Sequence, residues 1–166
     1  SDESLLRLLD QGCRVLKELY LDRCHQISDL GLMGLKRRGN MLMEVRHLNV
    51  AHLNIHDSAV NWISEGCKFL RSINIEGSLH VTEDGLVALG MLEYLKDVNL
   101  SDCVELTPSA FRSIFYPSEQ YTRLERHKSR RHLTSLNITR CILLDDDCLF
   151  VLSGGCTNLQ NLVMVG

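Results

Sequence analysis

Aromatic residues are scarce in this sequence, and no stretch of it stays apolar for long. Phe, Trp and Tyr make up 5% of its 166 residues, whereas hydrophobic residues make up 45%. Leucine carries the largest share of that apolar content, which hints at repetition in a chain long enough for one domain. No run reaches the roughly 18 apolar residues that a membrane-spanning helix needs, and no signal peptide is visible. We therefore expect no membrane partner.

The sequence also lacks an excess of charge of one sign and a compact cysteine pattern. A formal net charge of −3 gives no general attraction for nucleic acid, so nucleic acid is not an expected partner. An odd count of seven cysteines argues against a secreted disulfide framework and favours a reducing compartment. We expect a cytoplasmic protein, with nuclear or cytoskeletal and axonemal placement as the alternatives. The chain opens on Ser1 without a Met, as a fragment or a processed product would.

Motifs that carry chemistry are missing as well. No C-x₂₋₄-C pair suggests zinc, and no phosphate-binding loop, H-E-x-x-H or nucleophile elbow is present. We therefore predict no catalytic residues, no metal site and no cofactor, and the expected class is a protein that is not an enzyme.

What is present is an internal repeat. The first leucine-type position of each unit falls at Leu16, Val45, Leu70, Leu95, Leu133 and Leu159. Four of the five intervals are 29, 25, 25 and 26 residues, and one is 38. Leucine-rich repeats have periods of about 20–29 residues. The units predicted from this register are 13–41, 42–66, 67–91, 92–129, 130–155 and the truncated 156–166, with residues 1–12 as the end of a preceding unit.

Each unit predicts one short strand and one helix. Apolar residues alternate in the L-x-L core, as a strand with one buried face requires. In the segment that follows each strand, apolar residues recur at the spacing of a helix. Polar residues before the helices are expected to accept hydrogen bonds from the first helical amides, namely Ser28 or Asp29, Thr82, Thr107 and Asp145. Because one such unit cannot bury its own apolar face, stacking is required. The predicted fold is a single α/β leucine-rich-repeat solenoid over 1–166, with parallel strands on the concave face and helices on the convex face.

The cysteines occupy repeat positions rather than a site of their own. Cys24, Cys103 and Cys141 follow the strands, where a small side chain is expected to be buried and to donate weakly to the neighbouring loop. The pattern C-x-x-L-x-x-L-x-L-x-x-C-x-x-I-[ST]-D, clearest from Cys13 to Asp29, resembles the cysteine-containing leucine-rich repeats of F-box proteins and of the yeast mitotic-exit antagonist family. Leu53 and Ser78 replace the second Cys, and Pro108 replaces the Asp.

That resemblance implies a function in recognition. It implies the substrate-binding solenoid of a ubiquitin ligase, with an adaptor bound through an F-box outside this chain. The alternative interpretation is a structural scaffold subunit fixed in a large axonemal or organellar assembly. In both cases the partners are other proteins.

Two surfaces are candidate binding sites. On the concave face, residues between the buried strand positions must face solvent. The candidates there are Tyr20, Asp22, Arg23, Asn49, His52, Asn74, Glu76, Asn99, Asp102, Asn137 and Arg140. Four successive units place Asn in one column. These Asn side chains either hydrogen-bond one another or present donors and acceptors to a partner. Acidic residues of this face suggest a partner with some basic character.

The second surface is the long interval, where residues 116–131 carry five Lys or Arg against two Asp or Glu. Insertions in solenoids emerge as surface loops, so this one is either a solvated loop or a docking arm for an acidic partner or for nucleic-acid phosphates. Its candidate residues are Tyr121, Arg123, Arg126, Lys128, Arg130 and Arg131.

Overall fold

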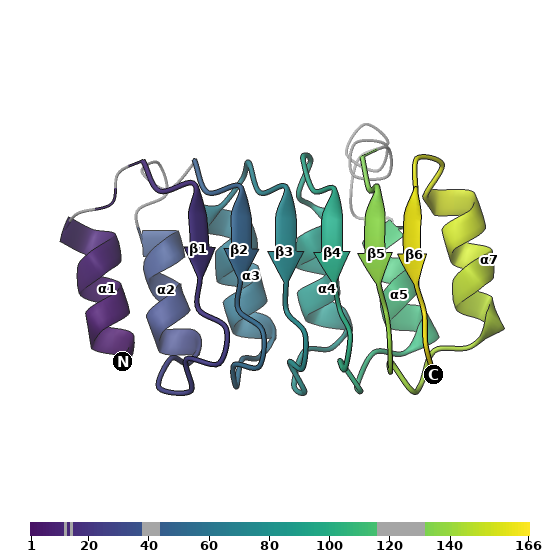
Figure 1. The fold of residues 1–166 in the computed structure, drawn as a ribbon, viewed down its shortest axis with the longest axis horizontal. Coiled ribbons are helices and arrows are strands. Elements are labelled where there is room, and N and C mark those ends of the chain that lie inside the picture. The colour runs from purple at the N-terminus through teal and green to yellow at the C-terminus, as the bar shows by residue number, and fades with distance from the viewer. Residues whose placement is uncertain (12, 14, 38–43, 116–131) are drawn as a thin grey trace.

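Six strands lie side by side in one layer, and the helices pack behind them (Figure 1). The computed structural model describes residues 1–11, 13, 15–37, 44–115 and 132–166. The strands are β1 (Glu18–Tyr20), β2 (His47–Asn49), β3 (Ser72–Asn74), β4 (Asp97–Asn99), β5 (Ser135–Asn137) and β6 (Asn161–Val163). The helices are α1 (Asp2–Gln11), α2 (Asp29–Arg37), α3 (Asp57–Gly66), α4 (Glu83–Gly90), α5 (Pro108–Phe115) and α7 (Asp146–Gly155).

The sheet is fully parallel, and its strand order is the chain order β1 to β6. The middle residue of each strand points into the core, and it is buried in every strand but β6. A helix is about 10 Å across, whereas neighbouring strands lie about 4.8 Å apart, so stacking puts the strands on the inner side of a curve. The predicted arrangement of strands and helices is confirmed.

The core is a stack of aliphatic layers, one for each repeat. Central positions such as Ile75, Leu86 and Leu100 are fully buried. At the amino-terminal end, Leu19 and Leu21 are slightly more exposed, at 7% and 9%, because no strand lies before β1 in the sheet.

The lateral hydrogen bonds continue past the strands into a tight turn in each repeat. There the amide of His52 donates to Glu76 O at 2.7 Å, and the amide of Asp102 donates to Thr139 O at 2.9 Å. The residues at this position have a positive φ between 55° and 68°, and they are Arg23, His52, Gly77, Asp102 and Arg140. Four of these five are not glycine, although this backbone region costs a residue with a Cβ on the order of 1 kcal/mol. The paired amides on either side hold the turn in place.

The cysteine after the turn links neighbouring repeats. Cys103 Sγ donates to Ile75 O at 3.4 Å, and Cys141 Sγ donates to Leu100 O at 3.1 Å, each a carbonyl of the preceding repeat. The predicted burial and weak donation are confirmed at these two positions. At Cys24 the prediction of burial is wrong, since its thiol is exposed beside β1, the outermost strand of the described sheet.

Ser78 stands at this cysteine position in the third repeat. Its side chain is completely buried, and its hydroxyl has no hydrogen-bond partner among the described residues. A C–O bond is shorter than a C–S bond, so the hydroxyl falls short of the carbonyl that a thiol reaches. A buried hydroxyl without a partner destabilises the folded state.

The helix starts are linked by carboxylates that reach into the next repeat. Asp2 opens α1, yet its oxygens accept from the amide and the hydroxyl of Ser28, both at 2.7 Å, at the start of α2. Asp57 opens α3 and accepts from the amide and the hydroxyl of Thr82 at 2.8 and 2.7 Å, and from Gly85 N at 3.0 Å. Asp29 does the same for α3 through His56 N and Ser58 Oγ. Each carboxylate satisfies amides that the next helix leaves free.

This arrangement corrects one predicted cap and confirms others. Thr82 does not cap α4 with its own side chain, because its hydroxyl donates to Asp57 instead. Ser28 Oγ accepts from Leu30 N at 3.3 Å while it also donates to Asp2. The later helices use their own caps: Thr107 accepts from Ala110 N at 3.2 Å, and Asp145 accepts from Asp147 N at 3.0 Å.

Replacing Ser78 with Cys is expected to raise the free energy of unfolding by about 1 kcal/mol, because the thiol can donate to the preceding repeat. Ser78→Ala should also be at least as stable as the wild type, since it removes the unpaired hydroxyl. Urea unfolding followed by circular dichroism measures all three proteins. Two variants less stable than the wild type would contradict this interpretation.

Replacing Asp57 with Ala is expected to lower the free energy of unfolding by about 1–2 kcal/mol, because the amides of Thr82 and Gly85 lose their acceptor. Asp84→Ala is the matched control, because Asp84 is an exposed carboxylate in the first turn of α4. Equal losses in the two variants would show that only the helix dipole matters and not the link between repeats.

Candidate functional site

The open sheet face consists of the strand residues that point to solvent, opposite the helices. The strand pairing places Glu18, His47, Ser72, Asp97, Ser135 and Asn161 in one column. It places Tyr20, Asn49, Asn74, Asn99, Asn137 and Val163 in the next. Both columns match the register predicted from the sequence. Tyr20 is 60% exposed, and its hydroxyl donates only to Glu18.

The asparagine side chains do not hydrogen-bond one another, so that predicted interpretation is wrong. Each Asn Oδ1 accepts instead from the amide two residues later in its own chain, at 3.0 or 3.1 Å. The four amides belong to Ala51, Glu76, Ser101 and Thr139. Each of these amides lies between two amides that donate to the following repeat, as Ala51 N lies between Val50 N, which donates to Asn74 O, and His52 N, which donates to Glu76 O. Asn therefore satisfies a main-chain donor that the sheet leaves unpaired.

The Nδ2 groups of the same side chains differ in whether they donate a hydrogen bond to the protein. Asn49 Nδ2 donates to Asp22 at 3.4 Å, and Asn99 Nδ2 donates to Glu76 at 3.0 Å. For Asn74 and Asn137, Nδ2 has no protein acceptor in the described part of the chain. These two half-buried side chains present oriented donors to whatever covers the open sheet face.

The charged candidates lie along the turns that follow the strands, and most of them are paired. His52 Nε2 lies 3.5 Å from Glu76 Oε1, and Arg140 makes a two-pronged bond to the carboxylate of Asp102. Asp97, which is also acidic, accepts from Thr134 Oγ1 at 3.2 Å. Among these acidic residues Asp102 has a cationic partner, whereas Asp97 and Asp22 accept from the neutral groups of Thr134 and Asn49. The expectation of a partner with some basic character stays a prediction.

The Asp102–Arg140 pair shifts both titrations. The hydrogen bond from Arg140 lowers the pKa of the Asp102 carboxyl below 3.8, against a smaller opposing effect of partial burial. The electrostatic effects of Arg140 and His52 also lower the pKa of Asp102. The same hydrogen bond raises the pKa of the Arg140 guanidinium. The pair links the turn that follows β4 to the turn that follows β5.

The buried thiols of the chain are poorly suited to reaction. Burial raises the pKa of Cys67, Cys103 and Cys156 to about 12, and that of Cys141 to about 11. The thiolate, which is the nucleophilic form, is correspondingly disfavoured. Within residues 1–115 and 132–166, apart from positions 12, 14 and 38–43, no group of three His, Cys, Asp or Glu could hold a metal ion. No helix in the described part of the chain is long and apolar enough to cross a membrane.

The predicted docking residues of the insertion, Tyr121, Arg123, Arg126, Lys128, Arg130 and Arg131, lie outside the described residues. Their role stays a prediction.

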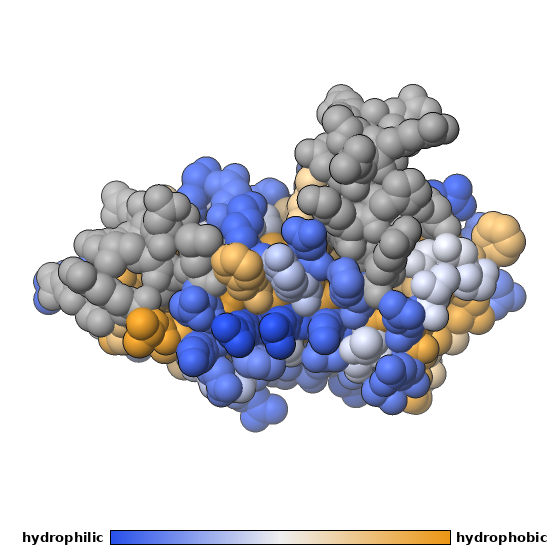
Figure 2. Space-filling view, turned by 90° about the horizontal axis from the view of Figure 1, so that it is seen from above, coloured by the Kyte–Doolittle hydropathy of each residue, from blue (hydrophilic) through white to orange (hydrophobic). Residues whose placement is uncertain are grey.

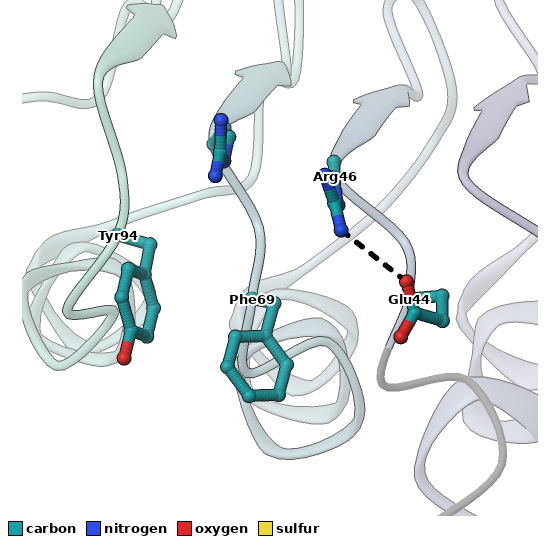
Figure 3. A pocket seen from close by; sticks show the side chains of 5 residues that line it. Glu44, Arg46, Phe69 and Tyr94 are labelled. Carbon is teal, nitrogen blue, oxygen red and sulfur yellow. Dashed lines mark hydrogen bonds and ion pairs between the residues drawn. The ribbon is translucent and has the colours of Figure 1, made fainter.

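A third surface, at the rim where the strands begin, was not predicted. Phe69 and Tyr94 lie side by side on neighbouring loops, with ring centroids 5.2 Å apart (Figure 3). With Glu44, Arg46 and Arg71 they line a groove of about 260 Å³. Seen from above, this rim shows hydrophobic side chains between hydrophilic ones (Figure 2). The signal in the sequence is the residue before each strand, which is basic in four successive repeats: Lys17, Arg46, Arg71 and Lys96.

Acid should weaken the Asp102–Arg140 pair. A carboxyl whose pKa is lower in the folded state stabilises the fold above its unfolded pKa of about 3.9, and that contribution is lost as the pH falls through the folded pKa. We expect the stability difference between the wild type and Asp102→Asn to be constant near pH 6 and to shrink below about pH 4. Urea unfolding across this range measures it, and a difference that does not change with pH would contradict the assigned pairing.

Comparison with known proteins identifies the fold. No protein-family model matches the chain. The crystal structure of the Rad7 and Elc1 complex in yeast contains a chain that matches with a TM-score of 0.79 and 21% sequence identity. The match covers 97% of this chain and 38% of that one, so this chain spans about two fifths of its length. The tropomodulin C-terminal domain of Caenorhabditis elegans matches with a TM-score of 0.66 and 14% identity, over 95% of this chain and 92% of the domain. The chain has the fold of these leucine-rich-repeat domains.

Proposed function

We propose that this chain is the recognition part of a larger protein and holds a partner protein on its open sheet face, without catalysing a reaction. The observation that carries the proposal is a rigid polar surface with unused bonding capacity. Asn74 and Asn137 offer oriented Nδ2 donors that no described residue accepts from, and Tyr20 exposes a large aromatic side chain. Aromatic residues and pre-oriented donors are typical of protein interfaces.

The rigidity of this face is part of the proposal. Each Asn is held by a bond to its own main chain, so its free Nδ2 is already oriented before a partner arrives. Side chains ordered in advance lose little entropy on binding. A partner segment with main-chain carbonyls or carboxylates in register with the repeats would accept these hydrogen bonds.

The more specific proposal is that the partner is a substrate of a ubiquitin ligase. It is supported by the resemblance of the C-x-x-L-x-x-L-x-L-x-x-C pattern to F-box proteins. A likeness in fold to a chain from the crystal structure of the Rad7 and Elc1 complex also supports a role in binding another protein. The second candidate is a scaffold subunit in a stable assembly. The likeness to the tropomodulin domain favours it only at the level of the fold.

Affinity purification of the full-length protein separates the two candidates. A substrate receptor is expected to recover a cullin and its adaptor, together with substoichiometric substrates. A scaffold is expected to recover only stoichiometric members of one complex, and that result would overturn the ligase proposal.

Changes on the open sheet face should weaken partner binding without unfolding the chain. We expect Tyr20→Ala and Ser72→Arg each to reduce the affinity for a recovered partner by about tenfold or more, through loss of an anchor and through added bulk. Both side chains lie outside the core, at 60% exposed for Tyr20 and half-buried for Ser72. Isothermal titration calorimetry measures the affinities.

Leu30→Arg on α2 is the matched control, because Leu30 is 60% exposed and lies in the helix layer. It should bind as the wild type does. Unchanged affinity in both sheet-face variants would show that the partner binds elsewhere.

A further inference from the structure

We propose that the rim where the strands begin is a second binding surface, and that it takes a short acidic peptide segment containing an apolar side chain. The surface, which we name the basic rim, comprises Lys17, Arg46, Arg71 and Lys96 together with Phe69 and Tyr94. It lies at the end of the sheet where the strands begin, and the proposal does not depend on what binds the open sheet face.

The main chain keeps the four cations in register. The amide of Arg46 donates to Lys17 O, that of Arg71 to Arg46 O, and that of Lys96 to Arg71 O, each at 2.8 Å. Neighbouring positions in such a ladder are about 4.8 Å apart. The fold thus arranges like charges in a row, where they repel one another.

Most of this positive charge is uncompensated. Arg46 pairs with Glu44 at 3.4 Å, and both side chains are partly exposed. Lys17, Arg71 and Lys96 are exposed, and their side chains contact no carboxylate in the described part of the chain. A row of like charges that the folded chain does not neutralise is a site for an anionic partner.

The aromatic pair beside the row favours an occupant that is also apolar. Phe69 is 38% exposed and Tyr94 is 42% exposed, and their rings lie tilted by 32° against each other. Arg71 lines the same groove of about 260 Å³, which has room for a side chain (Figure 3). An apolar side chain in the groove would place neighbouring carboxylates of the same peptide near Arg71 and Lys96.

The charges around the rim favour a peptide over nucleic acid. Carboxylates of Glu18, Glu44 and Asp97 lie along the same edge as the cations. A continuous polyanion would meet these carboxylates as well as the cations, whereas a peptide needs to place only two or three carboxylates. Because carboxylates lie among the cations, we expect the basic rim to bind an acidic peptide and not nucleic acid.

Selection from a displayed library of random twelve-residue peptides on the immobilised chain tests the proposal. We expect the selected peptides to combine two or more Asp or Glu residues with a nearby Leu or aromatic residue. A synthetic peptide of the selected sequence should lose about tenfold in affinity with Arg71→Glu or Lys96→Glu. It should lose about fivefold with Phe69→Ala, as fluorescence anisotropy would show.

The control variants keep the outcomes distinct. Arg112→Glu changes an exposed cation on α5, and Tyr20→Ala changes the open sheet face, so both should bind the peptide as the wild type does. Circular dichroism confirms that each variant is folded. Selected peptides without an acidic bias, or unchanged affinity with Arg71→Glu, would overturn the proposal. Tighter, Arg71-dependent binding of a twelve-nucleotide oligothymidylate would overturn it in favour of nucleic acid.

Discussion

The main-chain hydrogen bonds between neighbouring repeats are the constraint on which the rest of this structure depends. One strand and one helix cannot bury their apolar face alone, so each repeat must meet the next in a single register. The bonds extend from the residue before each strand to the left-handed turn after it, as at His52 N to Glu76 O. Between the last strand residue and the turn, one amide of each central repeat donates to no neighbouring main chain, and the Asn side chain two residues earlier accepts from it.

The helix layer is coupled by a different interaction, and this interaction changes along the chain. From α1 to α4, a carboxylate at the start of one helix satisfies the amides of the next, as Asp57 does for Thr82 and Gly85. A Cβ on Gly85 would come within 2.5 Å of Asp57 Oδ1, so the close approach itself requires glycine there. In contrast, α5 and α7 are capped by Thr107 and Asp145 from within their own repeats. Pro108 opens α5 without an amide hydrogen, which removes one donor that an incoming carboxylate would need.

The same stacking produces two surfaces with opposite chemistry. On the open sheet face Asp102 is paired with Arg140, and the groups left for a partner include neutral donors and the ring of Tyr20. On the basic rim, side chains such as Arg71 contact no carboxylate among the described residues and lie beside exposed rings. A repeat protein places any residue type in a line once that type recurs at one position, so both surfaces follow from the period.

The period, the columns and the fold were determined by the sequence alone, because side chains that recur at one spacing must stack in one register. Burial of Cys103 and Cys141 followed from that register, whereas exposure of Cys24 depended on its place at the end of the sheet. The partners of polar groups were decided only by the tertiary structure. Thr82 donates to Asp57 because that carboxylate, 25 residues earlier in the chain, lies beside it in the stack. Asn Oδ1 accepts from the amide two residues later, a local contact, but only the stacking of the repeats leaves that amide without a main-chain acceptor. The basic rim could have been found by reading one more column, while its groove required the side chains of three repeats to be placed together.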